Sequence, residues 1–192
     1  MLERAAVPWF GVTAYGVHMN GTVRDEYGLD HMWIARRSLS KPTAPGKLDQ
    51  LVAGGQPYGI GLRDNMLKEC AEEAGIPFDL ARHVRAAGAI TYVCETDEGI
   101  RPDVIFNFDL QLPPHFAPVN SDGEVGEFYL WDIGKVHDIV ANGQEFKANC
   151  ALVIIDFLLR HGHIEADHPE YEALARGLLP DIRAVPVHWL NA

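Results

Sequence analysis

The sequence predicts one domain built as an α/β or α+β sandwich. Stretches rich in β-branched and aromatic residues alternate with stretches of helical periodicity. No internal repeat and no linker divides the 192 residues. Apolar residues make up 47% of the chain and charged residues 22%, which is ordinary for a globular domain. We therefore expect residues 1–192 to form a single folding unit.

Three strands are expected in the first part of the chain. Aromatic and β-branched residues predict strands at residues 10–19, 31–37 and 48–53. The polar pair Asn20-Gly21 follows the first of them, and prolines and glycine make residues 38–47 a loop.

A helix is expected at residues 62–74. Apolar residues recur there at intervals of three and four, and Gly75 stands where a helix should stop. Further on we expect strands at 84–95 and 102–112, joined by the turn TDEGI, and a third strand at 127–133. Helices are predicted at residues 134–142, 148–161 and 169–177.

The charge and the cysteines limit the possible partners and locations. A formal net charge of −11 disfavours binding to nucleic acid polymers or anionic membranes, and a small anionic substrate would need cations at its site. Cys70, Cys94 and Cys150 show no metal or disulfide spacing, which predicts reduced thiols and a cytoplasmic protein. The sequence MLERAAVPWFGV lacks a signal-peptide pattern, and no apolar run is long enough to span a bilayer.

Three glutamates on the predicted helix 62–74 share one face. Glu69 and Glu73 lie four residues apart, and Glu72 lies three beyond Glu69, so their like charges repel. A divalent cation such as Mg²⁺ or Mn²⁺ would turn that repulsion into binding, because hard oxygen ligands suit both ions. The simpler alternative is a solvated helix face on which Lys68 pairs with Glu72.

The stretch GGQPYGIGLRDNMLKECAEEAGIP, residues 54–77, resembles a Nudix box. The pattern of that box is G, five residues, E, seven residues, then R-E-U-x-E-E-x-G-U, with U apolar. The matching positions are Gly54, Glu69, Cys70, Glu72, Glu73, Gly75 and Ile76. Two positions depart from the pattern, because Ile60 replaces its first glutamate and Lys68 replaces its arginine. A lysine keeps the positive charge but not the planar fork of arginine.

Further stretches between residue 10 and about residue 162 are similar to one branch of Nudix proteins. Among them are FGVTAYGVHMNG, GAITYVCETDEGIRPD, SDGEVGEFYLW and FKANCALVIIDFLLRHG. That branch is related to the Nudix module fused to thiamin pyrophosphokinase in fungi, and within it Ile60 is a branch feature. The resemblance implies an α/β/α sandwich with a mixed central sheet and the Nudix loop-helix-loop. We also expect a C-terminal helical elaboration at about 148–192 and no extra N-terminal domain.

The resemblance implies Mg²⁺-dependent hydrolysis of a diphosphate linkage in a small organic diphosphate. Thiamin diphosphate or its oxidised analogues would yield the monophosphate and phosphate. The implied metal ligands are Gly54, Glu69, Glu72, Glu73 and the distal acid Glu124, and the four glutamates are also the implied catalytic residues. The alternative for Glu124 is a solvated glutamate in the turn S-D-G-E. Glu127 is a weaker candidate for the distal acid, because alternation along its strand points it outward.

Four cations are candidates for binding the phosphates: Arg36, Arg37, Lys47 and Lys147. The alternative for the arginines is solvation of a strand end. Asn149 is a further candidate for substrate contact, and an N-terminal cap of the last long helix is its simpler role.

Three other functions remain open. The substrate could be a nucleoside diphosphate linked to another group, since the box sets the reaction and not the organic half. The chain could instead be a Nudix module that senses a diphosphate metabolite without turnover. A weaker alternative is isopentenyl diphosphate isomerase, which shares the fold. A homodimer is possible.

Overall fold

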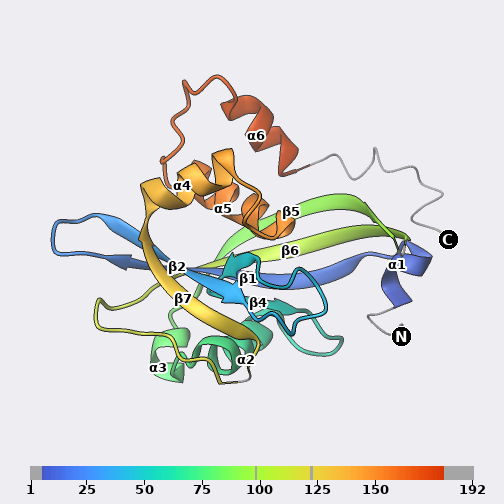
Figure 1. The fold of residues 1–192 in the computed structure, drawn as a ribbon, viewed down its shortest axis with the longest axis horizontal. Helices are drawn as coiled ribbons and strands as arrows, with labels where there is room; N and C mark the ends of the chain where they lie inside the picture. The colour runs from blue at the N-terminus through green and yellow to red at the C-terminus, as the bar shows by residue number, and fades with distance from the viewer. Residues whose placement is uncertain (1–5, 98, 122, 180–192) are drawn as a thin grey trace.

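The computed structural model describes residues 6–97, 99–121 and 123–179, and it shows a mixed sheet between two layers of helices. In Figure 1, α2 and α3 lie on one side of the sheet, and α4, α5 and α6 lie on the other. The α/β sandwich expected from the sequence is therefore confirmed. The elements in chain order are α1 (Val7–Phe10), β1 (Ala14–Arg24), β2 (Asp30–Arg37), β3 (Leu48–Gln50), β4 (Val52–Gly55), α2 (Leu62–Ala74), α3 (Phe78–Ala81), β5 (Arg85–Thr96), β6 (Gly99–Gln111), β7 (Val125–Asp132), α4 (Ile133–Asn142), α5 (Ala148–Arg160) and α6 (Tyr171–Gly177).

The sheet divides at β1, and this division creates the candidate site. The main path runs β3-β2-β1-β6-β5, with β1 and β6 parallel and the other pairs antiparallel. On its other edge β1 pairs first with β4, through residues 16–19, and then with β2, through residues 21–24. β7 pairs with β2 along nearly its whole length, from His31 to Arg37. The strands β2, β3, β4 and β7 therefore border a common space.

The first strand differs from its expected bounds. A short helix, α1, occupies residues 7–10, and β1 continues through Asn20-Gly21 to Arg24. The expectation that this pair follows the strand was wrong, because Gly21 pairs with Trp33 inside the sheet. A glycine is needed there because the Leu51 side chain packs directly against its backbone. A Cβ on Gly21 would lie 2.3 Å from Leu51 Cδ2. The actual turn follows Asp25, whose Oδ1 accepts hydrogen bonds from the backbone N–H groups of Tyr27 and Leu29.

The expected strand 48–53 is two strands. β3 pairs with β2 and β4 pairs with β1, so the chain changes partner at the buried Leu51. Apolar composition alone does not show such a change, because both halves are buried. The single-turn helix α3 was not predicted.

The predicted helix 62–74 and the β5–β6 hairpin are confirmed. α2 ends at Gly75, which has a left-handed φ of 61° and donates its N–H to the Cys70 carbonyl. The ladder of the hairpin closes with Thr96 paired to Gly99, and Glu98 of the predicted turn lies outside the described residues.

The three C-terminal helices are also present close to their predicted positions. The predicted cap at Asn149 was wrong, since Lys147 is the N-cap of α5 and Asn149 lies inside its first turn. The expected elaboration at 148–192 includes α5 and α6, and its residues 180–192 lie outside the described part.

Apolar side chains fill both faces of the sheet. On the α2 face, Met19, Leu51 and Met66 are fully buried in one cluster. On the α5 face, Ile34 and Ile154 are fully buried in another. Among the described helices, none has both the length and the apolar character that crossing a membrane requires.

Candidate active site

Helix α2 places its three glutamates in different environments. Glu73 is 9% exposed, and its Oε2 accepts a hydrogen bond of 2.7 Å from the backbone N–H of Ala53 in β4. Glu72 is about half exposed, and its Oε2 lies 2.5 Å from Lys68 Nζ. Glu69 lies between them in exposure, with Lys68 Nζ 3.4 Å from its Oε1. The simple surface pair Lys68–Glu72 is thus present, but it accounts for only the outer part of the cluster.

Gly54 is where strand β4 meets this helix. A Cβ built on Gly54 would lie 2.5 Å from Cδ and 2.8 Å from Oε1 of Glu69. Only a glycine lets the Glu69 carboxylate lie directly against the β4 backbone. The structure therefore brings Gly54 and Glu69 together, with Glu73 bonded to the neighbouring Ala53 and Glu72 farther out in solvent. Ile60, at the position of the missing glutamate, is 41% exposed in the loop before α2.

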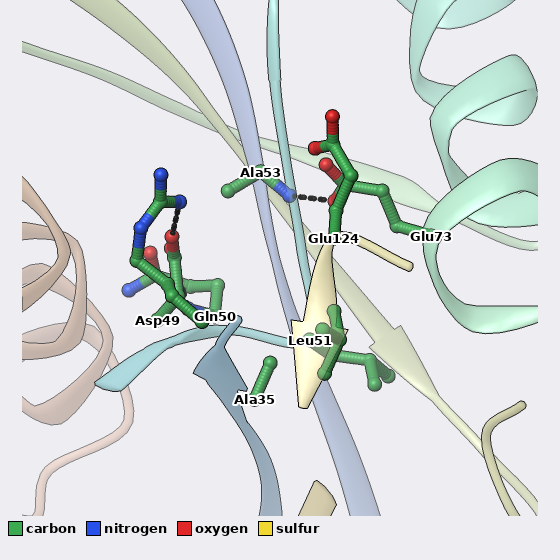
Figure 2. Close-up of a pocket in the computed structure, with 9 residues that line it drawn as sticks. Ala35, Asp49, Gln50, Leu51, Ala53, Glu73 and Glu124 are labelled. Atoms are coloured by element: carbon green, nitrogen blue, oxygen red, sulfur yellow. Dashed lines mark hydrogen bonds and ion pairs between the residues drawn. The ribbon is translucent and has the colours of Figure 1, made fainter. Parts of the chain in front are cut away.

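A cavity of about 20 Å³ lies where the sheet divides, large enough for roughly one water molecule. Figure 2 shows Glu73 and Glu124 on one side of Ala53, with Asp49 and Gln50 on the other. The cavity is lined by Ala35, Arg37, Asp49, Gln50, Leu51, Ala53, Glu73, Glu124 and Val125. Three carboxylates and one guanidinium thus border a small space that is partly open to solvent.

The carboxylates hinder one another's ionisation. Burial raises the pKa of Glu73 to about 8, and the charges of Asp49, Glu69 and Glu124 add to this rise, while the Ala53 hydrogen bond opposes it. Burial also raises the pKa of Glu69, against the opposing effect of Lys68. Carboxylate oxygens suit a hard divalent cation, whose charge would remove the repulsion. Among the described residues, however, no three of Glu69, Glu72, Glu73 and Glu124 bring their oxygens within 4.8 Å of one another, so a bound ion would have to draw them together.

Glu124, the candidate distal acid, lies directly before β7, on the cavity wall. Its carboxylate is paired with Lys41 of the loop between β2 and β3, and its backbone carbonyl accepts a hydrogen bond of 2.9 Å from the N–H of Ser38. The alternative acid, Glu127, is exposed and accepts a hydrogen bond from the Tyr129 hydroxyl. Of the two, Glu124 is the one that lines the cavity.

The four candidate cations separate into two pairs. Arg37 Nη1 lies 2.7 Å from Asp49 Oδ2, and Lys147 Nζ lies 3.9 Å from the same oxygen. Arg36 instead donates to the Gly46 carbonyl at 2.8 Å, and Lys47 donates to a carbonyl in the loop before α5. Arg37 and Lys147 therefore converge at the site, while Arg36 and Lys47 are bound to neighbouring loops.

Asp49 and Gln50 are functional candidates that the sequence reasoning missed. Both are buried in β3, and Gln50 bonds His18 Nδ1 at 2.7 Å and the Cys150 carbonyl at 2.8 Å. Two adjacent polar residues inside a predicted apolar strand were the available signal, because buried polar groups need partners. His18, Asp49 and Cys150 also bring one potential metal ligand each within 4.8 Å of one another.

Comparison with protein-family models gives no match. Among curated proteins, the chain is 50% identical over 170 residues to Nudix hydrolase 20, chloroplastic, of Arabidopsis thaliana, covering 88% of this chain and 45% of the relative. It is 48% identical to Nudix hydrolase 24, chloroplastic, of the same plant, covering 92% of this chain and 48% of the relative. The uncharacterized protein YJR142W of Saccharomyces cerevisiae is 35% identical, covering 89% of this chain and 54% of the relative. The chain spans about half the length of these relatives.

Solved structures agree on the fold. The Nudix domain of Shewanella oneidensis NrtR, complexed with ADP ribose, superposes with a TM-score of 0.60 over 78% of this chain and 88% of that domain, at 12% identity. The MutT protein of Methanosarcina mazei Go1 superposes with a TM-score of 0.55 over 78% of this chain and 95% of that protein, at 19% identity. At these identities the likeness shows the fold, and the fold is the Nudix fold.

One expectation is contradicted by the relatives. The cysteine pattern predicted a cytoplasmic protein, but both plant relatives are named chloroplastic. Free thiols exclude only oxidising compartments and do not distinguish one reducing compartment from another. The inference from cysteines to the cytoplasm was therefore wrong.

Proposed function

We propose that this chain, which has the Nudix fold and belongs to the Nudix hydrolase superfamily, hydrolyses a diphosphate linkage in a small organic diphosphate. One observation carries the proposal: the Glu69 carboxylate lies against Gly54 while Glu73 and Glu124 border the adjoining cavity. Solvated surface glutamates would not require a glycine opposite them, and Glu73 would not be buried.

A divalent ion would be held by Gly54, Glu69, Glu72, Glu73 and Glu124. When bound, Mg²⁺ or Mn²⁺ supplies the positive charge that neutralises a diphosphate and activates water. Glu73 is oriented by its hydrogen bond to Ala53. Glu124 enters the same cavity from directly before β7 and is the candidate for accepting a proton from the attacking water.

The cations of the chain would bind the phosphate oxygens. Arg37 lines the cavity, and Lys147 shares its partner Asp49, so these two are the favoured candidates. Arg36 and Lys47 bind backbone carbonyl groups, as Arg37 also does, but neither is among the residues that line the cavity. We therefore assign them supporting roles at the rim.

Thiamin diphosphate or an oxidised analogue is the favoured substrate. Its support is the similarity of stretches from residue 10 to about residue 162 to the branch related to thiamin pyrophosphokinase fusions, together with Ile60 in place of the box glutamate. A nucleoside diphosphate linked to another group is the second candidate, because the similar domain of NrtR was solved with ADP ribose.

A substrate panel tests the proposal. Thiamin diphosphate, its oxidised analogues, ADP ribose and a dinucleoside polyphosphate would be incubated with the chain and Mg²⁺, and release of monophosphate and phosphate measured. We expect turnover of the thiamin compounds and a loss of about 10²–10⁴-fold in Glu124→Gln, the usual contribution of a positioned proton acceptor. Glu172→Gln, on the exposed side of α6, is the matched control and should keep full activity.

Two results would count against the proposal. No Mg²⁺-dependent release from any compound would refute the hydrolase function. Binding of a diphosphate that persists in Glu72→Gln and Glu73→Gln, without turnover by the wild type, would favour a sensing module instead.

A further inference from the structure

Asp49 is a buried carboxylate with an unusual number of partners. Its side chain is 6% exposed, and its Oδ1 accepts a 2.9 Å hydrogen bond from the Gln50 N–H and one of 2.8 Å from the Cys150 thiol. Burying a carboxylate is costly unless it is paired, so this arrangement needs an explanation.

The second oxygen of Asp49 faces two cations that come from distant parts of the chain. Arg37 ends β2 and donates to this Oδ2 at 2.7 Å, while Lys147, at the N-cap of α5, approaches it to 3.9 Å. Arg37 is further held by the carbonyl groups of Thr43, at 2.8 Å, and Ala44. The guanidinium is thus fixed in place on the wall of the cavity.

The charge of Asp49 is stabilised by these partners. Burial by itself would raise the pKa of the Asp49 carboxyl, but Lys147 and the other groups around it outweigh burial and hold that pKa below its usual value. Two cations share one anion, so the group carries a net positive charge next to Glu73 and Glu124.

We propose that Asp49 is a positioning residue that holds Arg37 at the cavity wall and Lys147 beside it, so that both can receive the phosphate oxygens of the substrate. The inference rests on the proposed function, because the anion assigned to this wall is the substrate's diphosphate. In this arrangement the carboxylates of α2 and Glu124 take the metal, and the cations of β2 and α5 take the phosphate.

A metal site at His18, Asp49 and Cys150 explains the same residues less well. The acceptor oxygens of Asp49 are already engaged by Arg37, Gln50 and Cys150. Two cations within 4 Å of Asp49 would also repel a metal ion.

The test measures binding rather than turnover. Titration calorimetry with methylenediphosphonate, a diphosphate that cannot be hydrolysed at its bridge, would be run at saturating Mg²⁺. We expect Asp49→Asn to weaken binding about tenfold, the scale of a lost charged hydrogen bond. In the Arg37→Met/Lys147→Met background the same change should alter binding less than twofold, because nothing remains to position.

If Asp49→Asn weakened methylenediphosphonate binding as much in the double variant as in the wild type, the inference would be overturned, since Asp49 would then act without its cations. Titration with Mg²⁺ alone gives a second check. Asp49→Asn should bind Mg²⁺ as tightly as the wild type, and a loss of Mg²⁺ binding would make Asp49 a metal ligand instead.

Lys147 allows a test that does not disturb the buried carboxylate. Lys147→Met should weaken methylenediphosphonate binding several-fold, and Lys147→Arg should restore it, which a purely structural role would not produce. Lys135→Met, on α4, is the control and should bind normally. Unchanged binding in Lys147→Met would contradict the inference. If the binding results hold while no compound of the substrate panel is turned over, the hydrolase proposal fails and the positioning role stands.

Discussion

At the scale of single residues, burial decides what a side chain can do. Glu72 and Glu73 are neighbours in the sequence, yet Glu72 pairs with Lys68 in solvent, while burial raises the pKa of Glu73 to about 8. Burial likewise disfavours the charged form of the base His18. It is 3% exposed, and burial, assisted by Lys147, lowers its pKa to about 4. The imidazole is therefore neutral in the folded protein at neutral pH.

Stability should depend on the pH through His18. Its folded pKa of about 4 lies below the usual 6.5, so the unfolded chain binds the proton more readily between these values. The stabilising contribution is complete above about pH 6.5 and is lost as the pH falls towards 4, on the order of 1 kcal/mol per pH unit. The free energy of unfolding, measured with urea at pH 7 and at pH 5, gives this contribution.

His18→Gln is the comparison for this prediction. Glutamine can still hydrogen-bond Gln50 but has no proton to gain, so the variant should lose less stability than the wild type between pH 7 and pH 5. Equal losses in the two proteins would show that other groups cause the acid sensitivity.

At the scale of elements, the site depends on how closely a strand and a helix approach. β4 and α2 each have ordinary local signals, but their contact places Gly54 on Glu69 and Ala53 on Glu73. The divided sheet then brings β7 and the adjoining Glu124 to the same space. No single element contains the site.

Gly54→Ala tests that approach. The new Cβ would lie 2.5 Å from the Glu69 carboxylate carbon, so this flexible side chain must move away from β4. We expect Mg²⁺ binding to weaken at least tenfold, the scale of a misplaced charged ligand, while the fold persists. Gly126→Ala in β7 is the matched strand control, because its Cβ would meet nothing closer than 3.6 Å. Normal Mg²⁺ affinity in Gly54→Ala would mean that Glu69 is not a ligand.

At the scale of the whole molecule, one sheet carries an apolar cluster on each face. Met66 from α2 and Ile154 from α5 are both fully buried, on opposite sides. Because both clusters rest on the same strands, neither layer should be stable without the other. The candidate site uses residues from both layers, with Glu73 from α2 and Lys147 from the start of α5.

Met66→Ala and Ile154→Ala should each destabilise the protein by about 2–5 kcal/mol, the usual cost of a large-to-small change in a core. Both should lower the midpoint of one shared transition in calorimetry. A second transition in either variant would show that the two layers unfold separately, against the expectation of one unit.

Most of the fold and part of the site could be predicted from the sequence. Helix 62–74 and the β5–β6 hairpin were predicted because periodicity and turn residues act locally. The end of the first strand was predicted wrongly at Asn20-Gly21, because a glycine needed for packing against Leu51 cannot be told from a turn glycine in the sequence. Asp49 was missed because its partners Arg37 and Cys150 are 12 and 101 residues away.

The sequence by itself indicated the sandwich through its mixture of strand and helix patterns. It also determined the acidic helix face and the spacing of three glutamates on it, because these depend on neighbours within one or two helical turns. Only the tertiary structure decided which of them is buried, and which of four candidate cations meet at Asp49. Burial and ion pairing depend on which strands become neighbours. Along one edge of β1 the neighbour changes from β4 to β2, and local sequence patterns do not show this change.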